Sequence, residues 1–268
     1  LPQEEMPINC PIDIENLSTE EFGKFDYAVM RHMFATQNEI GRLADERVYQ
    51  VDVAQRLAAA GLPNDVEVAI ELTHQTFIKE LFLDLVVSCK AIYELKTVSA
   101  LSSNHLAQLL TYLYLLDLPR GKLVNFRSPK VESKFVNAPI PREERCGFSV
   151  SDEEFCGDHD LLALVVDLVR DWGTSLSVSL YHQAMTHFLG GEDAVERMLP
   201  LTRNGKTLAN QRFHLVDHEN AFELTALSKL DNEHHNHLRR LLDLSPLRAI
   251  HGINVGTHYV TFRTVARN

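Results

Sequence analysis

Three ionisable residues in the first half of the chain have the types and the spacing that phosphodiester chemistry requires. Asp84 is followed, after nine residues, by Glu94-Leu95-Lys96. Residues two apart on a strand point to the same face, so Glu94 and Lys96 project together if residues 90–98 form a strand. Asp84 then lies beside them when residues 77–87 form the preceding strand. Two carboxylates at a sheet edge suit Mg²⁺, and the lysine can stabilise developing negative charge.

The same three side chains could instead form an ordinary surface ion pair. A Glu-x-Lys triplet is common in protein sequences and carries little weight alone. The elements around the triplet must therefore decide between the two readings.

Helices and strands that could position these residues are predicted throughout the first half. Ser18 and Glu21 form a capping box that begins a helix over residues 18–36. A second helix is predicted over residues 40–60. The remaining elements, predicted from alternating apolar residues and capping signals, are strands over 66–72, 77–87 and 90–98, a helix over 104–116, and strands over 122–126 and 131–136.

The second half is predicted to repeat this plan. A helical stretch covers residues 161–189, and Asn204-Gly205 is a strong hairpin signal between strands over 197–202 and 207–216. The remaining elements are a strand over 220–227, a helix over 231–244, and strands over 249–255 and 258–264. The segment between the halves, rich in proline and charge, predicts a linker over residues 140–158 between domains 1–139 and 159–268.

The two halves also share polar residues in a fixed register. Glu94, His105 and Asn125 correspond to Glu223, His234 and Asn254 at one constant offset, without a gap. Leucines at a common spacing could reflect shared helix chemistry, whereas Glu, His and Asn matches are harder to obtain by chance. We therefore expect an internal duplication in an α/β fold, with a mixed central β-sheet flanked by helices in each domain.

Several stretches of the first half together resemble a known family. Asp84-x9-Glu94-x-Lys96 resembles the PD-(D/E)XK nuclease signature, and residues 38–137 resemble its GxxExxY branch. The stretches that carry this resemblance are Glu46-x-x-Tyr49, Ala59-Ala60-Gly61-Leu62, Phe82-Leu83-Asp84-Leu85-Val86-Val87, Tyr93-Glu94-Leu95-Lys96, His105-x-x-Gln108-x-x-x-Tyr112-Leu113 and Leu123-Val124-Asn125-Phe126. Two positions depart from the pattern: Gly41 lies five residues before Glu46 rather than three, and Leu83 replaces the proline.

The resemblance implies a restriction-endonuclease-like fold and a nuclease that cuts DNA or RNA with Mg²⁺ or Mn²⁺. Asp84 and Glu94 would be metal ligands, and Lys96 would be the catalytic lysine. Glu46 would add a carboxylate near the metal, and Gln108 would orient water or a phosphate. Residues 1–139 would then be a nuclease-like domain with an N-terminal helical extension.

The second half loses most of this chemistry. Glu223 corresponds to Glu94, but the positions of Asp84, Lys96, Glu46 and Gln108 correspond to Phe213, Thr225, Val178 and His237. Residues 159–268 are therefore expected to form a degenerate domain that binds no metal in the same way. This loss also motivates an alternative function, a non-catalytic structural or self-assembling protein that keeps a nuclease-like fold and could form a homo-oligomer.

Composition sets outer limits on the function. The chain has 268 residues, 45% of them hydrophobic, and a net charge of −11, which excludes collagen-like and disordered classes and disfavours a broad basic face. No apolar run is long enough for a transmembrane helix, so we expect a cytoplasmic protein that does not contact a membrane. The four cysteines form no CxxC pair, which disfavours a zinc ribbon, and Cys89 is expected to be buried.

Two further clusters are weaker candidates. Basic residues over 120–134 could contact phosphates or could only guard an edge strand. His234 and His237 share one helix face and could bind a transition metal, although a structural role is the simpler interpretation.

Overall fold

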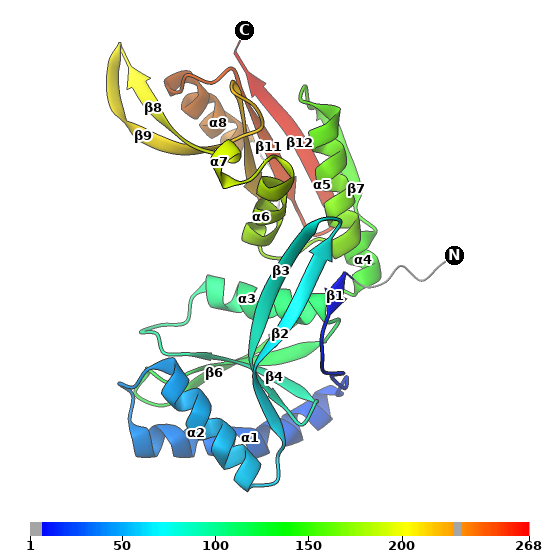
Figure 1. Cartoon of the computed structure of the whole chain (residues 1–268), viewed down its shortest axis with the longest axis vertical. Coiled ribbons are helices and arrows are strands. Elements are labelled where there is room, and N and C mark those ends of the chain that lie inside the picture. The colour runs from blue at the N-terminus through cyan, green and yellow to red at the C-terminus, as the bar shows by residue number, and fades with distance from the viewer. Residues whose placement is uncertain (1–6, 228–231, 268) are drawn as a thin grey trace. The chain divides into compact units, whose positions relative to one another are not determined.

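A computed structural model describes residues 7–227 and 232–267, and the chain falls into two compact units, Leu1–Pro141 and Arg142–Asn268. Each unit contains one six-stranded mixed sheet. Figure 1 shows helices beside each sheet. The predicted α/β fold class is therefore confirmed. None of the described helices combines the length and apolar composition needed to span a bilayer.

Unit 1 is built around a sheet that is antiparallel except at one pair of strands. Its strands are β1 (Ile8–Asn9), β2 (Asn64–His74), β3 (Phe77–Val87), β4 (Ala91–Lys96), β5 (Arg120–Asn125) and β6 (Glu132–Asn137), and its helices are α1 (Thr19–Ile40), α2 (Glu46–Ala59) and α3 (Ser103–Leu115). The strand order follows the chain from β1 to β6, and only β4 and β5 run parallel. Helix α3 supplies the crossover that a parallel pair requires.

The helices of unit 1 cover opposite faces of the sheet. Tyr49 and Val53 of α2 pack with Met33 of α1 in one core cluster, and α3 contributes Leu109 and Leu113 to another. Figure 1 shows α1 and α2 together on one side of the sheet and α3 on the other. Each helix therefore has one apolar face against the sheet, as the periodicity of the sequence predicts.

The helix predicted over residues 40–60 begins later than expected. Helix α1 continues to Ile40 and ends at Gly41, whose φ of 81° and ψ of −155° suit only glycine. The Tyr49 hydroxyl donates to the Gly41 carbonyl oxygen (2.9 Å) and accepts from the Ala44 amide (3.2 Å), so it ties the start of α2 to the end of α1. The glycine is a structural residue of this connection.

Unit 2 has the same strand order, with a different extra strand at its edge. Its helices are α4 (Arg142–Cys146), α5 (His159–Trp172), α6 (Val178–Phe188), α7 (Glu192–Val195) and α8 (Asn232–Leu244), and its strands are β7 (Ser149–Glu154), β8 (Glu196–Arg203), β9 (Lys206–Leu215), β10 (Asn220–Thr225), β11 (Ala249–Val255) and β12 (Tyr259–Ala266). Strands β8 to β12 are adjacent in chain order, with β10 and β11 parallel. Asp231, the predicted first residue of α8, lies outside the described residues.

The prediction of one helical stretch over residues 161–189 is wrong, for the same reason as in unit 1. Helix α5 ends at Gly173, with φ 80° and ψ 167°, and α6 begins at Val178. The Tyr181 hydroxyl donates to the Gly173 carbonyl oxygen (2.5 Å) and accepts from the Leu176 amide (3.3 Å). Both units therefore join their first two long helices through a glycine and a tyrosine.

The predicted linker over residues 140–158 is also wrong, because most of it belongs to unit 2. It contains α4 and β7, and β7 pairs in parallel with β12. The fully buried Arg145 donates to the carbonyl oxygens of Trp172 and Thr174, both at 3.2 Å, which holds α4 against the end of α5. The charged residues of this segment suggested exposure to solvent, because its pairing strand, β12, lies more than 100 residues further along the chain.

The expectation of a buried Cys89 is wrong as well. Cys89 is exposed in the tight turn between β3 and β4, where Ser88 and Cys89 have φ values of 53° and 52°. The Lys90 amide donates to the Val87 carbonyl oxygen at 3.0 Å and closes a turn around these two residues, and two left-handed central residues are typical of one class of tight turn.

The two glycines offer a matched test of this architecture. Gly41→Ala should lower the free energy of unfolding by about 1–3 kcal/mol through backbone strain alone, since a Cβ there meets nothing within 4 Å. Gly173→Ala should cost about 1–3 kcal/mol more, because its Cβ would lie 2.6 Å from Nη1 of the buried Arg145. Urea unfolding followed by circular dichroism compares the two, and an equal loss would contradict this packing.

Candidate active site

The three residues with the predicted spacing converge at the carboxyl end of β4. The Lys96 Nζ lies 2.6 Å from Oε1 of Glu94, 3.5 Å from Oδ2 of Asp84 and 4.0 Å from Oε1 of Glu46. One ammonium group thus faces three carboxylates from three elements: β4, β3 and the first turn of α2. This arrangement is more than a surface ion pair, because the side chain of Lys96 is only 12% exposed.

Asp84 reaches the group because β3 and β4 separate beside it. The pairing of these strands runs from Val87↔Ala91 to Leu85↔Tyr93 and goes no further. The Asp84 carboxylate instead accepts the backbone amide of Leu95 at 2.7 Å. A side chain thereby replaces the next step of the ladder and satisfies a donor that would otherwise be unpaired.

Burial controls the electrostatics of the group. The Glu94 side chain is 0% exposed, and burial together with the charge of Asp84 raises its pKa to about 8, although Lys96 opposes the shift. Burial also raises the pKa of Asp84, against the opposing effect of Lys96. Burial works to lower the pKa of Lys96, but the carboxylates of Glu94 and Asp84 outweigh it and raise that pKa.

Glu46 and Gln108 stand at the margin of the group. The Glu46 side chain is 41% exposed, and burial is the first cause of its raised pKa, which Lys96 partly offsets. Gln108 donates to the Tyr112 hydroxyl at 3.0 Å, and burial raises the pKa of Tyr112 to about 12, with Glu94 and Asp84 adding to the rise. The structure therefore brings Asp84, Glu94, Lys96 and Glu46 together, whereas Gln108 contacts Tyr112, whose pKa responds to the charges of Glu94 and Asp84.

Sequence reasoning missed two neighbours of this group. Gln50, which directly follows the quoted Tyr49, is buried and donates to the Asp84 carbonyl oxygen at 2.8 Å and to Oε1 of Glu67 at 2.7 Å. Its place one residue after the Glu46-x-x-Tyr49 motif is a weak signal that could have drawn attention to it. Nothing in the sequence marks Glu67.

The donor set fits a hard divalent cation. Oε2 of Glu94 is buried without a hydrogen-bond partner, which is costly unless something else occupies its lone pairs. In the described part of the chain, no three His, Cys, Asp or Glu side chains are arranged to hold a metal by themselves. Mg²⁺ is commonly held by one or two carboxylates, with waters and substrate phosphates completing its shell, so Asp84 and Glu94 suffice as protein ligands.

The corresponding positions of unit 2 lack this set. Glu223 is exposed, and the Thr225 hydroxyl donates to Oδ1 of Asn254 at 2.9 Å. Phe213, at the position of Asp84, packs into an apolar cluster with Leu242. Strand β9 of unit 2 therefore has an apolar core residue where β3 of unit 1 has the carboxylate of Asp84.

The weaker candidates of the sequence have other partners. Lys122 is buried in an ion pair with Asp26, beneath the ring of Phe135 at 4.1 Å, so it does not contribute to an open basic face. His237 lies 3.9 Å from Glu233 on α8, and no metal-holding cluster includes it among the described residues.

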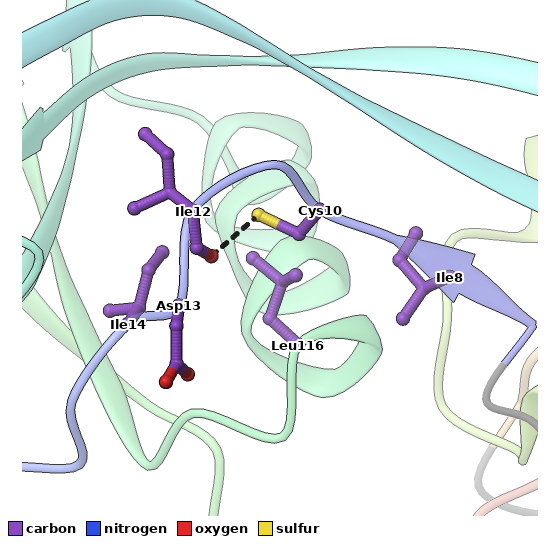
Figure 2. A pocket seen from close by; sticks show the side chains of 6 residues that line it. All are labelled: Ile8, Cys10, Ile12, Asp13, Ile14 and Leu116. Atoms are coloured by element: carbon purple, nitrogen blue, oxygen red, sulfur yellow. Dashed lines mark hydrogen bonds between the residues drawn. The ribbon is translucent and has the colours of Figure 1, made fainter.

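Unit 1 also contains a pocket of about 320 Å³ near α3 (Figure 2). Its lining residues are Ile8, Cys10, Ile12, Asp13, Ile14 and Leu116. The Cys10 thiol donates to the Ile12 carbonyl oxygen at 3.1 Å. This pocket has one carboxylate and shares no residue with the group around Lys96.

The part of the chain that contains this group matches one known protein family. Residues 24–136 match the PD-(D/E)XK nuclease superfamily. The matched nuclease-superfamily region runs from α1 to β6 and includes all five candidate residues, whereas residues 137–268 lie outside it. Searches of curated proteins and of solved structures find no significant match to the chain.

The buried Glu94 predicts a pH-dependent stability in metal-free buffer. Its pKa is about 8 in the folded chain against an ordinary 4.5, so the unfolded chain loses this proton first and stability falls as pH rises between these values. Glu94→Gln removes the effect, so the variant should match the wild type near pH 5 and exceed it by roughly 1–3 kcal/mol at pH 8. Urea unfolding across this range measures the difference. Burial also raises the pKa of Glu223, but no second carboxylate adds to the rise there, so Glu223→Gln should show a smaller slope. A pH-independent difference for Glu94→Gln would contradict the account.

Proposed function

We propose that this protein is a divalent-metal-dependent nuclease with one active site, in unit 1. The observation that carries the proposal is the convergence of Asp84, Glu94 and Lys96 at one sheet edge, inside the region that matches the nuclease superfamily. The substrate would be DNA or RNA, and the reaction would be phosphodiester hydrolysis with Mg²⁺ or Mn²⁺ as cofactor.

Each side chain has a separate task in this reaction. Asp84 and Glu94 would hold the cation, and a bound cation would supply polarisation of the scissile phosphate and activation of water. Lys96 donates hydrogen bonds to the phosphate as its negative charge grows, and its raised pKa keeps it charged near neutral pH. Glu46, the most exposed of the three carboxylates around Lys96, would add a carboxylate near the metal. Gln108 orients water or a phosphate oxygen.

We further propose that the chain belongs to the GxxExxY branch and arose by tandem duplication. The connection between the first two long helices supports the duplication, because Tyr49 and Tyr181 bond Gly41 and Gly173 in the same way. The buried amides of two asparagines give independent support. Asn125 bonds both backbone groups of Val98, and Asn254 bonds both backbone groups of Leu227.

Under this proposal unit 2 is a degenerate nuclease-like domain without a metal. Phe213 and Thr225 replace the aspartate and lysine, and the lost charges are replaced by packing and a hydrogen bond. Nucleic acid is the proposed partner, and it would be bound locally, since the chain as a whole carries a net charge of −11. A cytoplasmic location is proposed as well, supported by the four free thiols of Cys10, Cys89, Cys146 and Cys156.

Activity measurements test the proposed roles. Lys96→Ala and Asp84→Asn should each lower the rate of Mg²⁺-dependent cleavage by at least about 100-fold. Lys96→Ala removes the positive charge that faces the phosphate, and Asp84→Asn removes a charged metal ligand. Thr225→Ala and Glu223→Gln, at the unit 2 positions that correspond to Lys96 and Glu94, should cut at the wild-type rate. Cleavage of single- and double-stranded DNA and RNA by all four variants and by the wild type, with and without EDTA, is the assay. Undiminished cleavage by either unit 1 variant would refute the proposal.

Metal binding distinguishes the nuclease from the alternative assembly protein. Calorimetric titration with Mn²⁺ should show binding that Glu94→Gln weakens at least about 10-fold, because a neutral amide replaces a charged ligand. Glu223→Gln should bind as the wild type does. A chain that takes up no Mn²⁺ but self-associates in analytical ultracentrifugation would favour the assembly protein.

A further inference from the structure

The main chain of Asp84 is held by a buried side chain from another element. Gln50 of α2 is 3% exposed, and its amide nitrogen donates to both the Asp84 carbonyl oxygen and the Glu67 carboxylate. Arg47 donates to the amide oxygen of Gln50, which fixes the orientation of the amide group. Gln50 thus joins α2 to β2 and β3 at the residue that supplies a proposed metal ligand.

Glu67, the second partner of Gln50, has an unusual backbone. Its φ is 52°, which lies in the left-handed region. This conformation is unfavourable for any residue other than glycine inside a strand. The recorded pairing of β2 with β3 passes from Val66↔Leu85 to Val68↔Leu83 and omits Glu67 and Asp84. Such local irregularities bend strands and re-aim side chains.

The re-aiming is visible in the two cores of unit 1. Val66 and Leu85 pack on the cluster beneath α1 and α2, whereas Val68 and Leu83 pack on the cluster beneath α3. Residues two apart on a regular strand would face the same core. The hairpin of β2 and β3 therefore turns over at Glu67 and Asp84.

The corresponding hairpin of unit 2, formed by β8 and β9, is regular where the β2–β3 hairpin is not. His182 follows Tyr181 as Gln50 follows Tyr49, and Arg197 lies opposite Phe213 in the β8–β9 ladder, where Glu67 would lie opposite Asp84. Arg197 pairs with Phe213 in the regular ladder and has no left-handed backbone. Phe213 and Leu215 pack into the same core cluster, as a regular strand requires. The irregular backbone is thus found in the unit that carries the acidic group.

We propose that Gln50 is a positioning residue of the nuclease site, which fixes the reversal of the β2–β3 hairpin and thereby aims the Asp84 carboxylate at Lys96. Glu67 is the anchor that holds the Gln50 amide beneath this reversal. Gln50 touches neither phosphate nor cation, and its effect on the reaction passes through Asp84. This inference rests on the proposed function for its kinetic consequences, but its geometric claim concerns the metal-free chain.

The test compares Gln50→Leu with Gln55→Leu, an exposed position on the same helix. Gln50→Leu should weaken Mn²⁺ binding by about 10- to 100-fold, the range seen when a residue that orients a metal ligand is lost. The kcat of cleavage should fall by a similar factor, while KM for nucleic acid changes less than about threefold. Gln55→Leu should behave as the wild type in each measurement.

A second pair of variants separates positioning from general support of the fold. Glu67→Gln keeps an oxygen that accepts from Gln50, so it should retain Mn²⁺ binding and kcat. Glu67→Ala removes the anchor and should resemble Gln50→Leu. Wild-type Mn²⁺ affinity in both Gln50→Leu and Glu67→Ala, or an equal loss in Gln55→Leu, would overturn the proposal.

Crystal structures of the metal-free variants keep the test independent of activity. In Gln50→Leu, or in Glu67→Ala should the first variant fail to fold, the Asp84 carboxylate should move away from the Leu95 amide. An unmoved carboxylate would overturn the positioning role even in a chain that cuts nucleic acid. Conversely, a displaced carboxylate combined with a wild-type chain that neither binds Mn²⁺ nor cleaves would support the positioning role and refute the nuclease.

Discussion

The site of unit 1 depends on one ammonium group that offsets the burial of several carboxylates. Glu94 has no exposure to solvent, and an isolated carboxylate in such a place is strongly disfavoured. The Lys96 Nζ, 2.6 Å from Oε1 of Glu94, offsets part of the free-energy cost of burying this carboxylate, and the same ammonium group faces Asp84 and Glu46. Burial is the main cause that raises the pKa of Glu94 to about 8, and the negative charge of Asp84 adds to the rise because one lysine does not balance all the carboxylates of the group. A divalent cation would balance this negative charge. The same buried carboxylates thus raise the pKa of Glu94 in the metal-free chain and would bind the metal in the proposed reaction.

The two units show that fold and chemistry are separable. Both keep the strand order, the parallel pair, the glycine–tyrosine connection between helices and the asparagine that bonds a distant backbone segment. Among the residues that the structure describes, the acidic group and the irregular hairpin beside it are found in unit 1 alone. In unit 2 the same strand positions hold Phe213 and Thr225, which need no cation. The shared fold therefore does not by itself determine which side chains occupy these strand positions.

Local signals in the sequence were sufficient for the main elements of the site. Strand periodicity placed Asp84, Glu94 and Lys96 correctly, because β3 has the predicted bounds and β4 lies within the predicted strand. The capping box at Ser18 also forms as predicted. These features depend on residues a few positions apart, so a pattern in the sequence can reveal them.

The errors arose where contacts over long separations decide the structure. The breaks at Gly41 and Gly173 are accompanied by hydrogen bonds from tyrosine hydroxyls eight residues further along the chain, and the apolar pattern of the sequence continues across each break. The segment predicted as a linker is fixed by Arg145, whose partners are 27 and 29 residues away. Gln50 and Glu67 could not be assigned a role, since their link to Asp84 spans 34 residues and requires a backbone conformation that no residue type signals.

The central claim is that a cation enters between Asp84 and Glu94 in unit 1 and finds no equivalent place in unit 2. Anomalous diffraction from crystals soaked in Mn²⁺ tests it most directly. The account predicts a peak at about 2.1 Å from carboxylate oxygens of both residues, and none beside Glu223. Crystals that show no peak in unit 1, with Lys96 still closed on both carboxylates, would contradict it.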